Sequence, residues 1–173
     1  MKTKRARKIA RETPRKAPAF TLVVEDAKWR KNPATLKLVR RAARLALDHP
    51  PRRRRTVTIL LTDDKRLKHL NRQFCAKDKP TNVLSFAALD GARPKPGMPW
   101  LLGDVVLTSG VIAREAKAQR KSVQHHLSHL AVHGVLHLLG YDHEQDRDAE
   151  AMEALEIAAL AGMGIANPYE LGR

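Results

Sequence analysis

The chain contains almost no cysteine and few aromatic side chains. Cys75 is its only cysteine, which excludes an intrachain disulfide framework and favours a reducing cytoplasm as its compartment. Aromatic residues make up 4% of the 173 residues, too few for a platform on which many nucleic-acid bases stack. No apolar run approaches the ~20 residues that cross a bilayer, and no apolar signal core is found, so we expect neither a membrane protein nor a secreted one.

What the chain has in excess is positive charge. Its 33 Lys and Arg residues face 18 Asp and Glu residues, for a net charge of +15. The first sixteen residues hold eight of these cations and one acid, which leaves +8 for the rest of the chain. A polyanionic partner is therefore predicted, and nucleic acid is favoured over the alternative of a solvated basic surface.

Two regions are predicted along the chain. Residues 1–18 are basic, contain two prolines and lack an apolar period, so they are expected to form a disordered arm. A second interpretation of this arm is an organellar transit peptide. Residues 19–173 are long enough for one domain with one hydrophobic core.

The hydrophobic periods in this domain alternate between strand-like and helix-like. Strands are predicted at residues 20–24, 56–61, 81–87 and 101–107. Helices are predicted at residues 33–48, 111–121 and 146–162, and from a Ser122 cap to about residue 139. One more helix is predicted after a cap at Thr62 or Asp63, with Leu67, Leu70 and Phe74 on one apolar stripe. Residues 83–107 are predicted to form a hairpin with a long loop over 90–99. This order predicts an α+β fold with a mixed four-stranded sheet and about five helices.

Three histidines near the end of the penultimate predicted helix have metal-binding spacing. His133 and His137 are four residues apart, so both imidazoles leave the same helix face. Gly140 is expected to end the helix, and His143 can then return to the same point. Three imidazoles leave one position of tetrahedral Zn²⁺ for a water molecule, as in catalytic sites. One catalytic Zn²⁺ is therefore predicted at the end of a central helix, and the alternative is that these are ordinary surface or core histidines.

The same spacing occurs in metzincin proteases, where a glutamate after the first histidine acts as general base. Here that position holds Gly134, which cannot move a proton. The base would then be the zinc-bound water itself, Asp142 or the substrate, and a metalloprotease-like hydrolase remains the weaker alternative. His129, one turn before His133, is interpreted as a neighbour of a ligand, a phosphate contact or an exposed residue, and not as a ligand.

Three blocks in the same order resemble the YbeY family of zinc-dependent, single-strand-specific endoribonucleases. They are HGVLHLLGYDH at 133–143, KDKPTNVLSF at 77–86 and LGDVV at 102–106. The resemblance covers roughly residues 57–169. It implies zinc ligands at His133, His137 and His143, and work on the 3′ end of small-subunit ribosomal RNA. It also implies a role in ribosome quality control and contact with the small ribosomal subunit.

One position departs from the family pattern. An arginine usually precedes the KDKPT block, whereas this chain has Cys75, which is otherwise expected to be a small, partly buried residue. Arg72, one helical turn earlier, is a hypothetical substitute because i and i+3 share a helix face. A different class of function also stays open, in which the chain is a non-catalytic RNA-binding assembly factor and its zinc is structural.

The hypothesis for Arg72 makes a direct prediction. The substitution Arg72→Ala should lower RNA cleavage, RNA affinity or both, because it removes the cation that would take the place of the family's arginine. Cleavage and binding assays on a single-stranded RNA check this expectation. The hypothesis is rejected if both quantities match the wild type.

Overall fold

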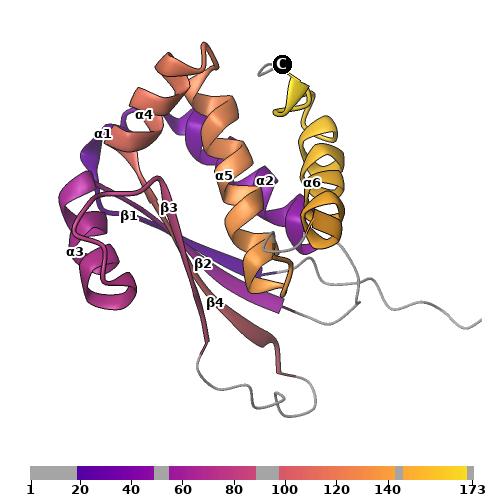
Figure 1. Ribbon diagram of the computed structural model, residues 1–173, viewed down its shortest axis with the longest axis horizontal. Coiled ribbons are helices and arrows are strands. Elements are labelled where there is room, and N and C mark those ends of the chain that lie inside the picture. Colours follow the sequence, from indigo (N-terminus) through magenta and orange to yellow (C-terminus); the bar gives the residue numbers. More distant parts are fainter. Residues whose placement is uncertain (1–18, 49–54, 89–97, 143–145, 171–173) are drawn as a thin grey trace, which may run out of the picture.

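A computed structural model of the protein describes residues 19–48, 55–88, 98–142 and 146–170 (Figure 1). The predicted basic arm and residues 90–97 of the predicted loop lie outside these ranges. The strands are β1 (Ala19–Val24), β2 (Arg55–Thr62), β3 (Val83–Ala87) and β4 (Trp100–Thr108). The helices are α1 (Ala27–Arg30), α2 (Pro33–Leu47), α3 (Asp64–Cys75), α4 (Ser109–Ala118), α5 (Val123–Leu138) and α6 (Asp146–Ala161). Among the described residues, no helix is long and apolar enough to span a bilayer.

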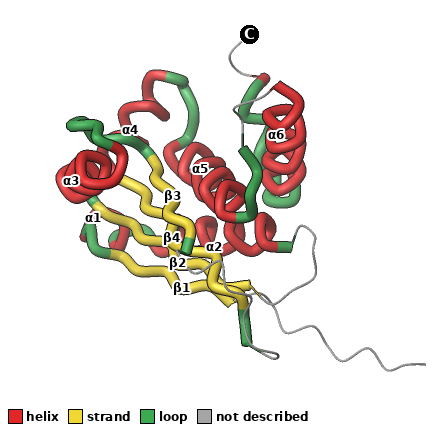
Figure 2. The backbone as a smooth tube through the Cα atoms, turned by 60° about the horizontal axis from the view of Figure 1, so that its bottom comes forward, coloured by secondary structure: helices red, strands yellow, loops and turns green. Residues whose placement is uncertain are grey.

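The four strands form one mixed sheet in the order β1-β2-β4-β3. β1, β2 and β4 are parallel, whereas β3 runs antiparallel to β4 as the first strand of a hairpin. Parallel neighbours need long crossover connections, and helices supply them here. The α+β class, the mixed four-stranded sheet and the 83–107 hairpin are therefore confirmed. Figure 2 shows the strands side by side with α5 and α6 beyond one face.

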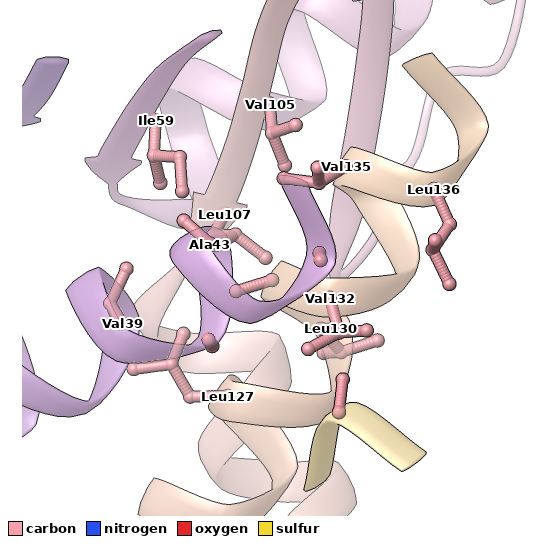
Figure 3. Close-up of a cluster of buried hydrophobic side chains, with 14 of the residues drawn as sticks. Val39, Ala43, Ile59, Val105, Leu107, Leu127, Leu130, Val132, Val135 and Leu136 are labelled. Carbon is pink, nitrogen blue, oxygen red and sulfur yellow. The ribbon is translucent and has the colours of Figure 1, made fainter. Parts of the chain in front are cut away.

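The main core lies between this face of the sheet and two helices. Figure 3 shows Val39 and Ala43 of α2 beside Ile59 and Leu107 of the sheet and Leu127 of α5, all five of them fully buried. α5 contacts α2, α4, α6, β3 and β4. Neighbours on several sides of α5 fit the prediction of a central helix.

α3 differs from the prediction. Leu67 is fully buried as expected, but Phe74 is 60% exposed, so the predicted apolar stripe is wrong at that end. The buried residue one turn after Leu67 is Asn71, whose side-chain amide donates to the carbonyl of Lys79 at 2.7 Å. Phe74 instead meets the ring of Phe86 edge-on, with centroids 5.2 Å apart. The short helix α1 was also not predicted, because four residues are too few to show a period.

The N-terminus of α4 is capped from a distance. Thr108 occupies the N-cap position but makes no side-chain cap bond of its own. Asp64 of α3 accepts hydrogen bonds from the backbone N–H groups of Gly110 and Val111, both at 3.0 Å, and from Arg114 at 2.8 Å. Its carboxylate also accepts from the Thr108 hydroxyl. One carboxylate thus joins α3 to α4 and accepts hydrogen bonds from backbone N–H groups in the first turn of α4, which have no partner within that helix.

The pKa of Asp64 is lowered, because hydrogen bonds from Thr108, Arg114 and Val111 outweigh the burial that would raise it. The substitution Asp64→Ala should lower the free energy of unfolding by about 1–2 kcal/mol. This difference should be complete above about pH 4 and should fade as the pH drops through the lowered pKa. Denaturant melts at several pH values measure it.

Asp78→Ala is the matched control. The carboxylate of Asp78 is exposed and forms a 3.5 Å ion pair with Lys68, and exposed pairs contribute little. A loss of stability in Asp64→Ala that is no larger than in this control, or that persists unchanged at acid pH, would refute the capping role.

Candidate metal centre

α5 ends immediately after the second histidine of the motif. Gly140 adopts a left-handed backbone with φ of +92°. Its N–H donates to the carbonyl of His137 at 3.0 Å, and the N–H of Tyr141 donates to the carbonyl of Leu136 at 3.1 Å. This pair of bonds is the Schellman arrangement, which favours glycine at the left-handed position. The chain therefore turns away from the helix axis where the sequence predicts it.

His133 and His137 lie together on one face of α5. Their Nε2 atoms are 3.0 Å apart, and the two rings meet nearly at right angles with centroids 4.5 Å apart. His143, the third predicted ligand, lies outside the described residues. Within the described ranges no three His, Cys, Asp or Glu side chains form a group that could hold a metal, so the complete three-histidine site stays a prediction.

A buried glutamate from α6 lies behind the first histidine. The Glu156 side chain is 1% exposed, and its Oε1 accepts a hydrogen bond from Nδ1 of His133 at 2.7 Å. Its Oε2 accepts from Nε2 of His129 at 2.8 Å and from the hydroxyl of Tyr169. One carboxylate thus fixes two imidazoles of α5 and the chain segment after α6.

Glu156 is ionised despite its burial. Burial alone would raise its pKa, but hydrogen bonds from His129 and His133, the charge of His129 and the hydroxyl of Tyr169 together lower the pKa to about 2. The pKa of Tyr169 is raised by its own burial and by the adjacent Glu156, so its phenol stays neutral and donates. An ionised acceptor at Nδ1 assigns the Nδ1–H tautomer to His133, which directs the lone pair of Nε2 toward His137.

The donor set fits a zinc ion. Two nitrogen ligands on tetrahedral Zn²⁺ lie about 3.3 Å apart, given the usual Zn–N distance of about 2.0–2.1 Å, and the two Nε2 atoms here are 3.0 Å apart. Metal-binding histidines typically donate their other N–H to a carboxylate, as His133 does to Glu156. Imidazoles also favour Zn²⁺ over Mg²⁺. His133 and His137 are therefore suited to hold the metal.

The position that carries the general base in metzincins faces the sheet here. A Cβ atom on Gly134 would lie 2.5 Å from Cγ1 of Val105 and 3.2 Å from the hydroxyl oxygen of Ser85. The same serine donates to the carbonyl of Gly134 at 3.0 Å. A glutamate at this position would displace β4 before it could reach a metal, so the packing of α5 argues against the protease mechanism.

Known proteins match this chain over most of its length. The family model described as Endoribonuclease YbeY matches residues 24–164. The chain belongs to the YbeY family. The Endoribonuclease YbeY of Azorhizobium caulinodans is 47% identical over 154 residues, which cover 87% of this chain and 95% of that protein. The protein of the same name from Paramagnetospirillum magneticum is 55% identical over 115 residues, 65% of this chain and 70% of its own.

A solved structure supports the fold of this YbeY family member. The solution structure of a Thermotoga maritima protein aligns with a TM-score of 0.53 at 20% identity and covers 88% of this chain and 95% of its own. At this level of identity the likeness concerns the arrangement of helices and strands alone. It agrees with the sheet and helices described above.

The structure also describes the other residues singled out in the sequence. Arg72 is exposed on α3, and Cys75, the last residue of that helix, is also exposed, so its predicted partial burial is wrong. Asp142 is exposed in the turn that follows Tyr141. His129 is not simply exposed, because it bonds to the same carboxylate as His133. For Arg72 and Asp142 a catalytic role stays a prediction.

Sequence reasoning missed Glu156, although a signal was present. The predicted inward face of α6 includes Met152 and Leu160, and both are fully buried. Glu156 lies four residues from each of them, so it is an acid on an otherwise apolar stripe. A buried charge needs a partner, and the histidines of α5 were the natural candidates.

Glu156→Gln tests the part played by this carboxylate. The amide keeps the shape of the side chain but not its charge, so affinity for Zn²⁺ should fall about 10- to 100-fold. Competition with a chromogenic zinc chelator measures the affinity, and circular dichroism reports the fold. Glu150→Gln, an exposed glutamate of the same helix, should bind zinc as the wild type does. Equal affinities of the two variants would show that Glu156 does not support a metal ligand.

Proposed function

We propose that this protein is a zinc-dependent endoribonuclease that cuts single-stranded RNA, with the metal bound by His133, His137 and His143. The observation that carries the proposal is the convergence of two imidazoles on one helix face, with an ionised carboxylate behind the first of them. Membership of the YbeY family supports the reaction and the substrate, because the curated relatives carry the name endoribonuclease.

The side chains of this chain have distinct parts in such a reaction. Glu156 holds His133 in one tautomer and one orientation, while His129 and Tyr169 hold Glu156. Bound zinc would supply Lewis acidity toward a phosphoryl oxygen, or toward a water molecule, at neutral pH. Asp142 follows the helix end and directly precedes His143, which makes it the candidate proton acceptor. Gly134, which directly follows His133, has no side chain that could act as a general base.

The charge of the chain supports RNA as the substrate. A net charge of +15 favours binding along a phosphate backbone by release of counterions. With few aromatic residues available for stacking, sequence specificity would come from the surroundings of the cut site. The family resemblance, not the charge, is the ground on which we propose the 3′ end of small-subunit ribosomal RNA and ribosome quality control, in the cytoplasm, as the setting of this activity. The small ribosomal subunit would be the partner.

The proposal predicts one bound zinc per chain and loss of cleavage on ligand removal. His143→Ala should stay folded and keep its affinity for RNA. Its cleavage of a single-stranded RNA should fall at least about 100-fold, because a Lewis acid contributes several kcal/mol to such a reaction. Metal analysis of the purified protein accompanies the cleavage assay.

His69→Ala, an exposed histidine of α3, is the control and should cut at the wild-type rate. Product ends then separate two routes, since a 2′,3′-cyclic phosphate excludes direct attack by water. A folded His143→Ala variant that cuts as fast as this control would contradict the proposal. Loss of folding on metal removal, with no RNA cleavage by the zinc-loaded wild type, would favour an assembly factor with structural zinc.

A further inference from the structure

A pocket with basic and apolar walls lies toward the opposite end of α5 from the metal centre. The pocket, of about 170 Å³, opens beside the N-terminus of this helix. Its basic side is formed by Arg120, Lys121, His125, His126 and His129, and its other wall by residues around Ile165 and Pro168. No acidic side chain of the described residues lines it, but Glu115 and Glu156 lie behind its wall, bonded to His126 and His129. Such a cavity offers a ligand the positive charge of Arg120 and Lys121.

His126 has an unused ring nitrogen in this pocket. Its side chain is only 6% exposed, and Nε2 lies 2.8 Å from a carboxylate oxygen of Glu115. The other ring nitrogen, Nδ1, is buried and has no hydrogen-bond partner among the described residues. A buried polar atom without a partner is costly. With Nε2 directed to Glu115, a ligand that hydrogen-bonds to Nδ1 would give this buried atom a partner.

The start of α5 adds backbone donors to the same place. Ser122 is the N-cap residue, but its side chain makes no cap hydrogen bond. The first N–H groups of a helix have no partner within the helix, and the dipole of a sixteen-residue helix favours an anion there. Lys121 Nζ donates to the carbonyl of Pro168 at 2.8 Å, which holds the far wall against the helix start.

The histidines of α5 connect this pocket to the metal centre. His126, His129, His133 and His137 follow at steps of three, four and four residues, so they form a row on one face of the helix. The rise from His126 to His133 is about 10 Å, a span that an extended strand covers in a few nucleotides. Figure 1 shows α5 running from its start near α4 to its opposite end, where the last turns carry His133 and His137.

We infer that this pocket binds a phosphate group of the RNA strand a few nucleotides from the cut site. The inference rests on the proposed function, which supplies the substrate. Arg120, Lys121 and the helix N-terminus offer donors, and phosphate oxygens are acceptors. A free phosphate ion would present the same chemistry, so the experiment distinguishes the two sources.

The test compares two exposed cations in the full-length, zinc-loaded protein. Arg120 lines the pocket and has a left-handed backbone with φ of 54°, which asparagine tolerates, so Arg120→Asn removes the charge without backbone strain. Lys37→Gln removes one charge from the exposed face of α2, away from the pocket. The probe is a fluorescent single-stranded 2′-O-methyl RNA followed by anisotropy at several salt concentrations. A denaturing gel verifies that the strand stays intact.

Arg120→Asn should weaken binding about five- to tenfold at low salt. It should also reduce the slope of log affinity against log salt by about 0.7, the value for one lost phosphate contact on a single strand. Lys37→Gln should change the RNA affinity and the salt slope less than Arg120→Asn does. In ¹⁵N-histidine spectra of the wild type, the RNA should shift the Nδ1 resonance of His126, and inorganic phosphate should compete for that shift.

Two results would overturn the inference. The first is equal affinity and equal salt slope for Arg120→Asn and Lys37→Gln while the wild type binds and cuts RNA normally, which leaves the proposed function intact. The second is a shift of His126 by inorganic phosphate but not by RNA, which would identify a site for a free anion. Failure of the wild type to bind RNA at all would count against the proposed function instead.

Discussion

The candidate metal centre depends on one buried carboxylate. Glu156 is removed from water, yet its pKa is lowered to about 2, because imidazole and hydroxyl donors surround it. A buried charge of this kind is tolerated only when every partner is in position, so it ties the docking of α6 against α5 to the orientation of His133. The hydrogen bond from His133 Nδ1 to Glu156 also leaves Nε2 as the nitrogen that faces His137. The packing of α6 against α5 and the orientation of the candidate ligand His133 therefore depend on the same carboxylate.

α5 carries this centre because it is held from several directions. The sheet, α2, α4 and α6 all contact it, and Gly134 allows it to lie close to Val105 and Ser85. That close approach gives the helix a fixed position but leaves no room for an acid next to the first histidine. The fold thus keeps two histidines at the spacing of metal ligands and leaves no room for the base that metzincin proteases have beside theirs.

Local signals in the sequence were sufficient for most of the fold. Asn32 before Pro33, Asp63 and Gly140 act at the helix ends that they predict, and β-branched runs form the strands. Phe74 was misjudged because a helical period shows which residues share a face, but not whether a neighbour covers that face.

Glu156 was missed for a related reason. Its contacts with His129 and His133 span 27 and 23 residues and exist only once α6 has docked. His143 lies outside the described residues, so its place in the site rests on spacing and family resemblance.

X-ray absorption at the zinc edge of the purified protein tests the three-histidine metal centre most directly. The account predicts stoichiometric zinc with nitrogen or oxygen neighbours at about 2.0–2.1 Å and the multiple scattering of three imidazoles. A His143→Ala sample should show one imidazole fewer. A sulfur neighbour at about 2.3 Å, which only Cys75 or a methionine could supply, or the absence of bound zinc, would contradict it.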